Sequence, residues 1–333
     1  MPAPHGPLRA YYRLVPYLRR LEPERRKTWA SLAAAWAGLV LPGTLLGIWL
    51  WNLGGGWLHL LAPPLAAAAV AAWLSPSVIY PFKHEFKRKI IRPMMRELLE
   101  DADYAPLGSV SALDLQASLL FNQPFSGVEG EDLVIGRHEG VEIKFSEVVG
   151  YREHESQGLA TPLAPRSERG FKARQVLFRG LFFVADFNKP TRGQVVVHPD
   201  RLEARLGPVA GALQPRRDES GLVHVRMEDP RFERRFVVYA SSAEAAHYAL
   251  TPALMERLAE FREQVGAPVA FSILYGKLYM AVATHKNMLE PPLFGSLTSP
   301  HVFRGYLEDV ELFLSLVEAL GLNRRIWGDG TWP

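Results

Sequence analysis

The sequence predicts an α+β protein in which an N-terminal two-helix transmembrane hairpin precedes a mainly antiparallel β domain with several helices. Two observations predict this class. Residues 29–82 contain no Asp, Glu, Lys or Arg, although 22% of the chain consists of these residues. After residue 109, short segments with strand-like alternation follow one another across short turns, and helical periodicity returns near the end of the chain.

The transmembrane hairpin is predicted over residues 29–80, with helices at 29–51 and 57–80. Each run reaches the roughly 20 apolar residues that a helix needs to cross about 30 Å of hydrocarbon. Asn52 and the Gly-rich residues 53–56 join the two runs. A cleaved signal peptide is the alternative for the first run, but a signal core has about 7–15 apolar residues and needs no second long run after it.

Aromatic and small residues within the hairpin predict how it is placed and packed. Amphipathic rings prefer the interface between membrane and water, and we assign to it Trp29, Trp51, Trp57 and Tyr80. Gly43 and Gly47 form a GxxxG pattern, which lets helices approach closely. Either the two spans pack on each other, or this face binds a second copy or a partner helix. The absence of Asp, Glu, Lys and Arg disfavours a channel or transporter.

Charge is distributed unevenly along the chain. Residues 1–98 hold 13 Lys and Arg against 4 Asp and Glu, whereas the whole chain carries +3, so residues 99–333 carry −6. Basic residues close to a span tend to stay cytoplasmic, which predicts a multi-pass membrane protein with both termini in the cytoplasm. The basic pI therefore reflects membrane topology, and we expect the lipid bilayer and no nucleic acid as a partner.

Two flanking segments connect the hairpin to the rest of the chain. Residues 1–28 form a cytoplasmic basic segment, whose helical pattern we expect Pro16 and Pro23 to interrupt. Residues 81–100 form a juxtamembrane amphipathic helix with a kink expected near Pro93. Its apolar side chains recur every four residues, at Phe82, Phe86, Ile90, Met94 and Leu98.

Residues 101–333 form the predicted cytosolic α+β domain. A short helix over 111–121 begins with a capping arrangement of Ser111 and Asp114. Two hairpins are expected: one pairs residues 131–135 with 141–145, and the other pairs 174–187 with 194–198. A loop is expected at 156–170, between the two hairpins. A partly closed, pleckstrin-like barrel is one arrangement that analogy offers. Further strands are expected at 222–227, 235–239, 269–275 and 278–283, and helices at 200–206, 242–250, 252–265 and 301–320.

The common catalytic motifs are absent from the sequence. It has no P-loop, no Gly-rich dinucleotide fingerprint, no HExxH, no GxSxG and no cysteine. The pairs His138–Glu139 and His154–Glu155 offer metal-binding side chains, but such adjacent turn residues are typically solvated. We therefore expect no cofactor, no metal and no catalytic residues of a known type, and whether the chain is an enzyme stays open.

The candidate ligand-binding residues are Asp186, Asn188, Glu147 and Arg179. Asp186 and Asn188 end an apolar strand. A carboxylate cluster for acid–base or metal chemistry could form where Asp186 meets Glu147, Glu228 and Asp229. Turn formation explains Asp186 and Asn188 equally well, because both side chains bond nearby backbone groups. Arg179 could bind an anionic group or pair with an acidic side chain.

Several segments together resemble the bacterial membrane family catalogued as domain of unknown function 3137. They are Glu131-Asp132, residues 145–148, 178–189, 227–230 and 248–255, and the terminal residues 322–327. The resemblance implies an inner-membrane protein with a cytosolic domain and a LemA-like membrane protein as an associated partner. It implies no activity and no catalytic residues.

Three functions are compatible with these features. The first is a membrane-anchored scaffold or protein-binding module in a membrane complex, including a homo-oligomer. The second is a lipid-binding or small-ligand-binding domain held at the membrane surface. The third is a membrane-anchored enzyme that uses Asp186 or neighbouring carboxylates.

Overall fold

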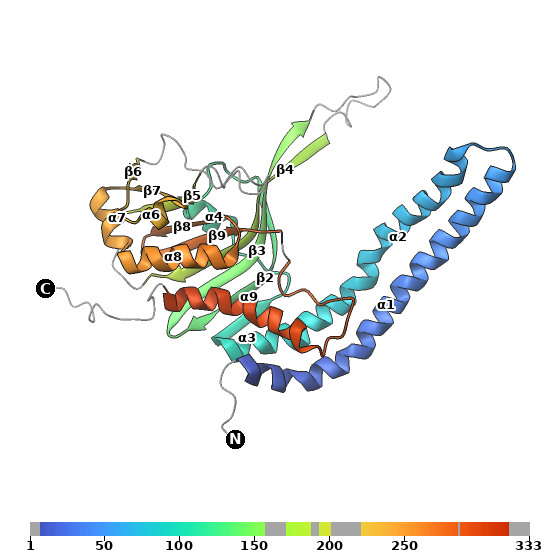
Figure 1. The fold of residues 1–333 in the computed structure, drawn as a ribbon, viewed down its shortest axis with the longest axis horizontal. Helices are drawn as coiled ribbons and strands as arrows, with labels where there is room; N and C mark the ends of the chain where they lie inside the picture. The colour runs from blue at the N-terminus through green and yellow to red at the C-terminus, as the bar shows by residue number, and fades with distance from the viewer. Residues whose placement is uncertain (1–6, 157–170, 188–192, 201–220, 286, 320–333) are drawn as a thin grey trace. The chain divides into compact units, whose positions relative to one another are not determined.

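The computed structural model describes residues 7–156, 171–187, 193–200, 221–285 and 287–319. The chain forms two compact units, coloured by residue number in Figure 1. The first unit consists of residues 1–97 and 289–308, and the second of residues 98–288 and 309–333. The first unit therefore includes a segment that the chain reaches only after completing most of the second.

Two long helices, α1 (Pro7–Asn52) and α2 (Trp57–Phe86), dominate the first unit. Each contains an apolar window long enough to cross a membrane, by length and composition. Only 11% and 6% of these two windows is buried within the chain, whereas the core helix of a soluble protein is mostly buried. The prediction of two long apolar helices at the N-terminus is confirmed.

Helix α1 runs without interruption through Pro16 and Pro23, so the expected break in the basic segment was wrong. A proline removes one intrahelical hydrogen bond, but packing of an apolar face can hold the helix together. Leu14, Leu18 and Leu21 form such a face and are buried. The basic segment and the first apolar run are therefore parts of one helix.

Close backbone contact holds the apolar halves of α1 and α2 together. A Cβ atom added to Gly47 would lie 2.3 Å from the Leu60 carbonyl oxygen, and one added to Gly43 would lie 2.9 Å from the Ala67 Cβ. The GxxxG face thus packs within the hairpin. Trp36 Nε1 also donates to Ser75 Oγ across the two helices at 3.0 Å.

The aromatic residues predicted to lie at the membrane interface occur at two levels of the hairpin. Trp51 and Trp57 lie at the turn, with ring centroids 4.8 Å apart. The pairing of Trp36 with Ser75 places Trp29 and Tyr80 at nearly the same level of the antiparallel helices. At about 1.5 Å per residue, Trp29 and Trp51 are roughly 33 Å apart along α1, close to the thickness of a hydrocarbon core.

The juxtamembrane segment contains an irregular turn. One π-helical turn, η1 (Lys87–Ile91), separates α2 from the short helix α3 (Arg92–Leu98). Pro93 has no N–H and its ring displaces the carbonyl four residues earlier, that of Lys89, which lies within η1. The proline therefore widens the helix just before itself, near the expected kink.

Residues 289–308, which we call the return segment, are fastened to α1 through Glu22. The Glu22 carboxylate accepts hydrogen bonds from Arg25 Nη2 at 2.7 Å and from the Leu297 backbone N–H at 3.0 Å. Arg25 in turn donates to the Leu293 carbonyl at 2.7 Å. The hydrogen bond from Arg25, followed by that from Leu297, lowers the pKa of Glu22 from 4.5 to about 2.

A second carboxylate, Glu290, fastens the return segment to α2 and η1. Its two oxygens lie 2.5 Å from Lys83 Nζ and 2.9 Å from Lys87 Nζ. Lys87 is buried, and this ion pair offsets part of the cost of burying its charge. The Tyr306 hydroxyl donates to the Glu290 carbonyl at 2.5 Å, and its ring packs on Phe86.

Nine strands of the second unit form one sheet within the described ranges, and all their pairings are antiparallel. Their order is β1-β2-β3-β4-β9-β8-β5-β7-β6. The strands are β1 (Glu100–Ala105), β2 (Gly127–His138), β3 (Val141–Ser156), β4 (Phe171–Asp186), β5 (Val195–Pro199), β6 (Val223–Val225), β7 (Phe236–Ala240), β8 (Val269–Leu274) and β9 (Lys277–Ala283). The α+β class is confirmed, and among these strands β1 and β6 form open edges in place of a closed barrel.

One predicted hairpin is confirmed and the other was wrong. Strands β2 and β3 pair across a two-residue turn. Strands β4 and β5 do not pair, because β9 and β8 lie between them in the sheet. The β8–β9 hairpin closes through Tyr275-Gly276, both with positive φ, and its tight turn allows the two strands to insert as a unit.

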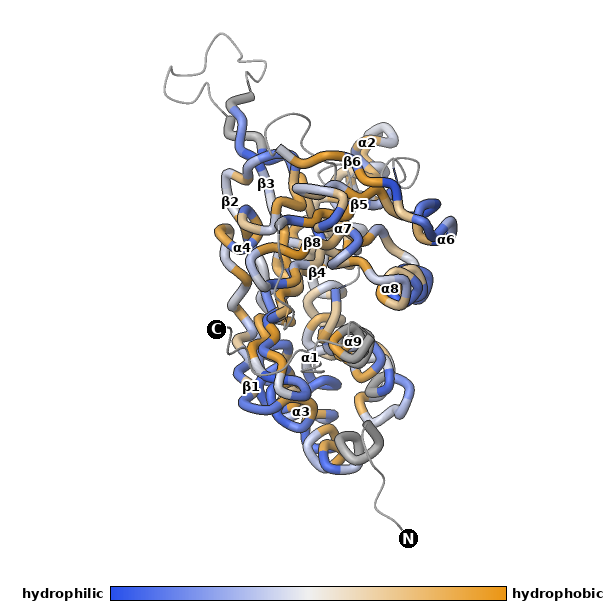
Figure 2. The backbone as a smooth tube through the Cα atoms, turned by 90° about the vertical axis from the view of Figure 1, so that its left-hand side faces the viewer, coloured by the Kyte–Doolittle hydropathy of each residue, from blue (hydrophilic) through white to orange (hydrophobic). Residues whose placement is uncertain are grey.

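Helices cover both faces of this sheet, as Figure 2 shows for α4 (Ala112–Ala117) on one side and α8 (Pro252–Val265) on the other. The core beneath α4 includes Leu115, Phe182 and Val196. On the opposite face Phe236 packs on Phe271 and on Phe232 of α6 (Pro230–Glu233).

The remaining helices agree with the sequence prediction. They are α7 (Ala243–Ala249), α8 and α9 (Pro300–Ala319). The predicted helix at 200–206 and most of the predicted loop at 156–170 lie outside the described residues.

Candidate functional site

Hydrogen bonds hold helix α4 in shape and fix its end to the sheet. Ser111 and Asp114 form the predicted capping box at the start of α4. At its end, buried Ser272 of β8 donates to the Ser118 carbonyl at 2.6 Å. Leu119 has a φ of 57°, which turns the chain back over the sheet. This turn brings Phe121 into the core.

A hollow of about 630 Å³ lies between this loop and the sheet, and we call it the α4 pocket. Helix α4 and its loop contribute Gln116, Ala117, Leu119, Phe121, Gln123, Pro124 and Phe125. The sheet side contributes Gln194, Val196, His198, Leu222, Tyr239 and Tyr275. Its volume falls within the range of about 300–1,000 Å³ typical of small-molecule sites.

The apolar wall of the α4 pocket is part of the core and is therefore preformed. Phe121 lies 4.9 Å from Phe125, 5.1 Å from Phe178 and 6.2 Å from Phe182, measured between ring centroids. Leu119 and Leu222 pack against the same cluster. Because their neighbours hold these rings, a ligand would meet an apolar surface that needs little reorganisation.

The polar groups in the described lining of the pocket are amides, hydroxyls and an imidazole. Gln194, Val196 and His198 share one face of the chain at β5, and Tyr239 lies directly opposite Val196 on β7. The Gln194 amide donates to the Tyr275 hydroxyl at 2.7 Å. No Asp, Glu, Lys or Arg occurs among the described residues that line the pocket.

Two of the predicted ligand-binding residues meet in a different hollow, the Arg179 groove, of about 320 Å³. Arg179 donates to Asn287 Oδ1 at 3.0 Å, and the Glu147 carboxylate accepts from the Met288 backbone N–H. The groove is lined by Leu107, Glu129, Gly130, Glu131, Glu147, Val148, Val149, Arg179, Gly180, Thr284 and Asn287. Both candidate side chains thus have partners within the second unit.

The other predicted residues are not part of this groove. Asp186 pairs with Lys277 on the neighbouring strand β9 at 3.3 Å. Asn188 lies outside the described residues. Asp229, considered as a member of a carboxylate cluster, caps α6 and accepts from the Arg231 and Phe232 backbone N–H groups. These separate partners favour structural roles for the carboxylates, and we assign no catalytic group.

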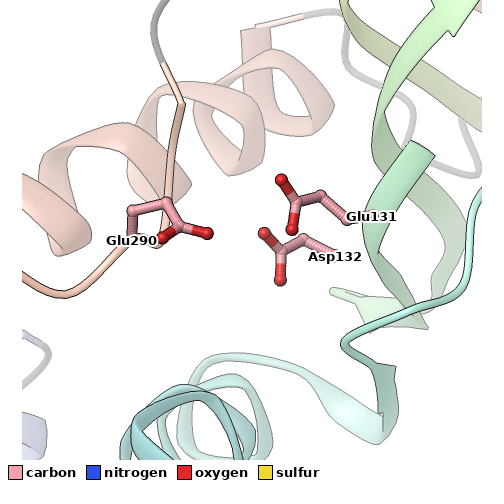
Figure 3. Close-up of side chains that lie close together, drawn as sticks. All are labelled: Glu131, Asp132 and Glu290. Atoms are coloured by element: carbon pink, nitrogen blue, oxygen red, sulfur yellow. The ribbon is translucent and has the colours of Figure 1, made fainter. Parts of the chain in front are cut away.

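Further carboxylates, drawn in Figure 3, lie at an irregularity of β2. Glu131 and Asp132 are adjacent there, and Asp132 has a φ of 61° at a shift in strand register. The buried Asp132 carboxylate accepts a hydrogen bond from the Tyr104 hydroxyl. Glu290, labelled in the same figure, belongs to the first unit and pairs there with Lys83 and Lys87. We assign no metal to these side chains.

The α4 pocket was missed at the level of sequence. Its lining comes from segments that are separated by up to 159 positions, from Gln116 to Tyr275. The available signal was the alternation of Gln194, Val196 and His198 along a buried strand, which places two polar side chains on one face.

Comparison with known proteins supports the resemblance to a family. Residues 176–322 match the model of the family described as Protein of unknown function (DUF3137). The match contains the segments 178–189, 227–230 and 248–255 that carried the resemblance, which is confirmed for this region. It does not include the helical hairpin or the segments at 131–132 and 145–148, so it says nothing about a membrane.

A search of curated proteins found no significant match. A solved structure with detectable similarity is the crystal structure of the mycobacterial trehalose monomycolate transport factor A, TtfA. The similarity covers 66% of this chain and 88% of that chain, with 12% identity and a TM-score of 0.34. A TM-score this low carries neither fold nor function from one protein to the other.

Proposed function

We propose that this protein is a membrane-anchored binding protein whose second unit holds a small molecule in the α4 pocket. The observation that carries the proposal is the pocket itself, with a volume of about 630 Å³ and a rigid aromatic wall beside a few polar groups. Such concave, largely preformed sites are typical of small-molecule binding. The predicted residues Glu147 and Arg179 are less suited, because their side chains already have partners.

The anchoring part of the proposal rests on the surface of the hairpin. Its outward side chains include Leu45, Leu58 and Trp73, which are 67%, 76% and 77% exposed, and so large an apolar surface requires lipid or protein to cover it. The basic flanks favour insertion in a bacterial inner membrane with both termini in the cytoplasm. A reporter fused after Pro333 should be active in the cytoplasm. Activity confined to the periplasm would contradict this topology.

Ligand binding is tested with the full chain in lipid nanodiscs. Ala117 lines the pocket and is exposed, so Ala117→Trp should fill the hollow without disturbing the core. Leu113→Trp is the matched control, because Leu113 lies on the same helix, is 75% exposed and does not line the pocket. Three water-soluble probes each carry a phenyl ring and differ in charge: phenyl β-glucoside, phenyl phosphate and trimethylphenylammonium.

The readout is saturation transfer from protein to probe by NMR. We expect at least one probe to bind the wild-type chain and Leu113→Trp, with a signal at least fivefold weaker for Ala117→Trp. Absence of transfer to all three probes, or an equal signal from Ala117→Trp, would overturn ligand binding in this pocket.

A protein partner is the second candidate function, and an edge strand favours it. Among the described strands, β6 is an edge of the sheet, and its Val223 is 53% exposed. An exposed edge can pair with an added strand from another chain. The partner would be a LemA-like membrane protein or a second copy of this chain. Gentle purification from native membranes should then yield a stoichiometric complex, and repeated recovery of a lone monomer would contradict this role.

A further inference from the structure

We infer that the α4 pocket takes a neutral, hydroxyl-bearing molecule with an apolar ring or chain, an inference that rests on the proposed function. Charge, amide chemistry and the shape of the apolar wall each support one part of this description.

The lack of Asp, Glu, Lys and Arg among the described lining residues supports a neutral ligand. The described lining contains no Asp, Glu, Lys or Arg, whereas the Arg179 groove is lined by Glu129, Glu131, Glu147 and Arg179. An ionised group that enters an aromatic pocket loses hydration, and the described lining offers no carboxylate, ammonium or guanidinium group to compensate for the loss. The two hollows of the same unit therefore differ in the charge of the ligand that each could accept.

The glutamines support hydroxyl groups on the ligand. A primary amide carries both a donor and an acceptor, as does a hydroxyl, so the two form hydrogen bonds in either direction. In the part of the chain that the structure describes, neither the Gln116 nor the Gln123 amide makes a hydrogen bond to protein. The Gln194 amide uses its NH₂ group on Tyr275 and presents a carbonyl acceptor. The pocket thus holds amide groups that the fold itself does not require.

The aromatic wall supports an apolar portion on the same ligand. Phe121 and Phe125 pack edge to face at 4.9 Å, and both line the pocket. Leu119 and Leu222 extend this apolar surface. A ligand with polar groups alone would leave the wall in contact with water and gain nothing from its burial. An amphipathic molecule uses both parts of the lining.

The test compares the three phenyl probes by affinity. We expect phenyl β-glucoside to bind the full chain in nanodiscs at least tenfold more tightly than phenyl phosphate and trimethylphenylammonium. The double variant Gln116→Leu/Gln123→Leu should weaken glucoside binding about tenfold or more, because two hydrogen bonds are lost. Gln264→Leu is the control, since Gln264 is an exposed glutamine of α8 outside the pocket. Thermal unfolding of both variants should match the wild type.

The outcomes separate this inference from the proposed function. If a charged probe binds as tightly as the glucoside or more tightly, and Ala117→Trp abolishes its binding, the pocket is a ligand site but not one for neutral molecules. If the glucoside binds and the double glutamine variant retains full affinity, the assignment of hydroxyl recognition to the amides is wrong. If none of the probes binds, the proposed function fails together with the inference.

Discussion

The two ends of the helical hairpin are held together by different forces. Near the basic end, Glu22 and Glu290 pair with arginine and lysine side chains and fasten the return segment. Toward the turn, the helices meet through Gly43 and Gly47, with one hydrogen bond from Trp36 to Ser75. Ion pairs suit a region that water and charge reach, whereas close packing suits hydrocarbon. On this ground we propose a membrane boundary near Trp29.

The largest effect should come from removing the carboxylate shared by two lysines. Glu290→Ala removes the ion pair with buried Lys87 together with the one to Lys83, and breaking a buried ion pair typically costs about 3–5 kcal/mol. Hydrogen exchange of the amides at residues 293–297 should accelerate strongly. Glu85→Ala is the control, because Glu85 pairs with Arg88 and Lys89 at the surface and should cost less than about 1 kcal/mol. Equal protection in both variants would show that Glu290 does not hold the return segment.

Acid should loosen the same end of the hairpin through Glu22. Hydrogen bonding lowers the pKa of Glu22 in the folded state from 4.5 to about 2. The contribution of Glu22 to the free energy of unfolding is therefore complete above pH 4.5 and is lost as the pH falls toward 2. The shift corresponds to about 3 kcal/mol. Glu22→Gln should remove this part of the pH dependence, whereas the exposed neighbour Glu24→Gln should keep it. Denaturation in mixed micelles between pH 2 and 7 measures the difference.

Overpacking should separate α1 from α2 in the half of the hairpin nearer the turn. Gly47→Val places a side chain against the Leu60 carbonyl and should cost about 1–3 kcal/mol. Gly38→Val is a matched control on the same helix, because a Cβ at Gly38 would meet nothing within 4 Å. Unfolding in mixed micelles compares the two variants. If Gly38→Val is the more damaging, α1 and α2 do not pack through Gly47.

The smallest effect concerns the single hydrogen bond between the spans. Ser75→Ala removes the acceptor of Trp36 Nε1 and should cost about 0.6 kcal/mol, the average for such bonds in membrane helices. Thr44→Val is the control, since the Thr44 hydroxyl bonds the Leu41 carbonyl of its own helix. Denaturation in mixed micelles compares the two, and an equal or larger loss for Thr44→Val would contradict the role of Ser75.

Local patterns predicted those parts of the fold that depend on neighbours in sequence. The absence of charge defined the two apolar helices, and Ser111 with Asp114 defined the start of α4. Pairing across distance was not predictable. Strands β4 and β5 were paired because they are consecutive, whereas the β8–β9 hairpin occupies the place between them. Two-residue alternation shows which face a strand buries but not which strand lies beside it.

The sites show the same limit. Glu147 and Arg179 were chosen as charged residues among strands, and the structure brings them to one groove because β3 and β4 are neighbours. The α4 pocket escaped prediction because half of its polar residues are glutamines, which carry no charge signal and are common on surfaces. The contact of the return segment with α1 was not predicted for another reason, because Glu22 and Leu297 are 275 positions apart.

The fastening of the return segment has a consequence for synthesis of the chain. Lys87 leaves the ribosome 203 residues before Glu290, its partner in the ion pair. At about 5–20 residues per second, this delay lasts roughly 10–40 seconds. During that time the apolar halves of α1 and α2 can pack, whereas the ion pairs to the return segment at the basic end cannot yet form. The first unit is therefore begun first and finished late, after nearly all of the second unit has been made.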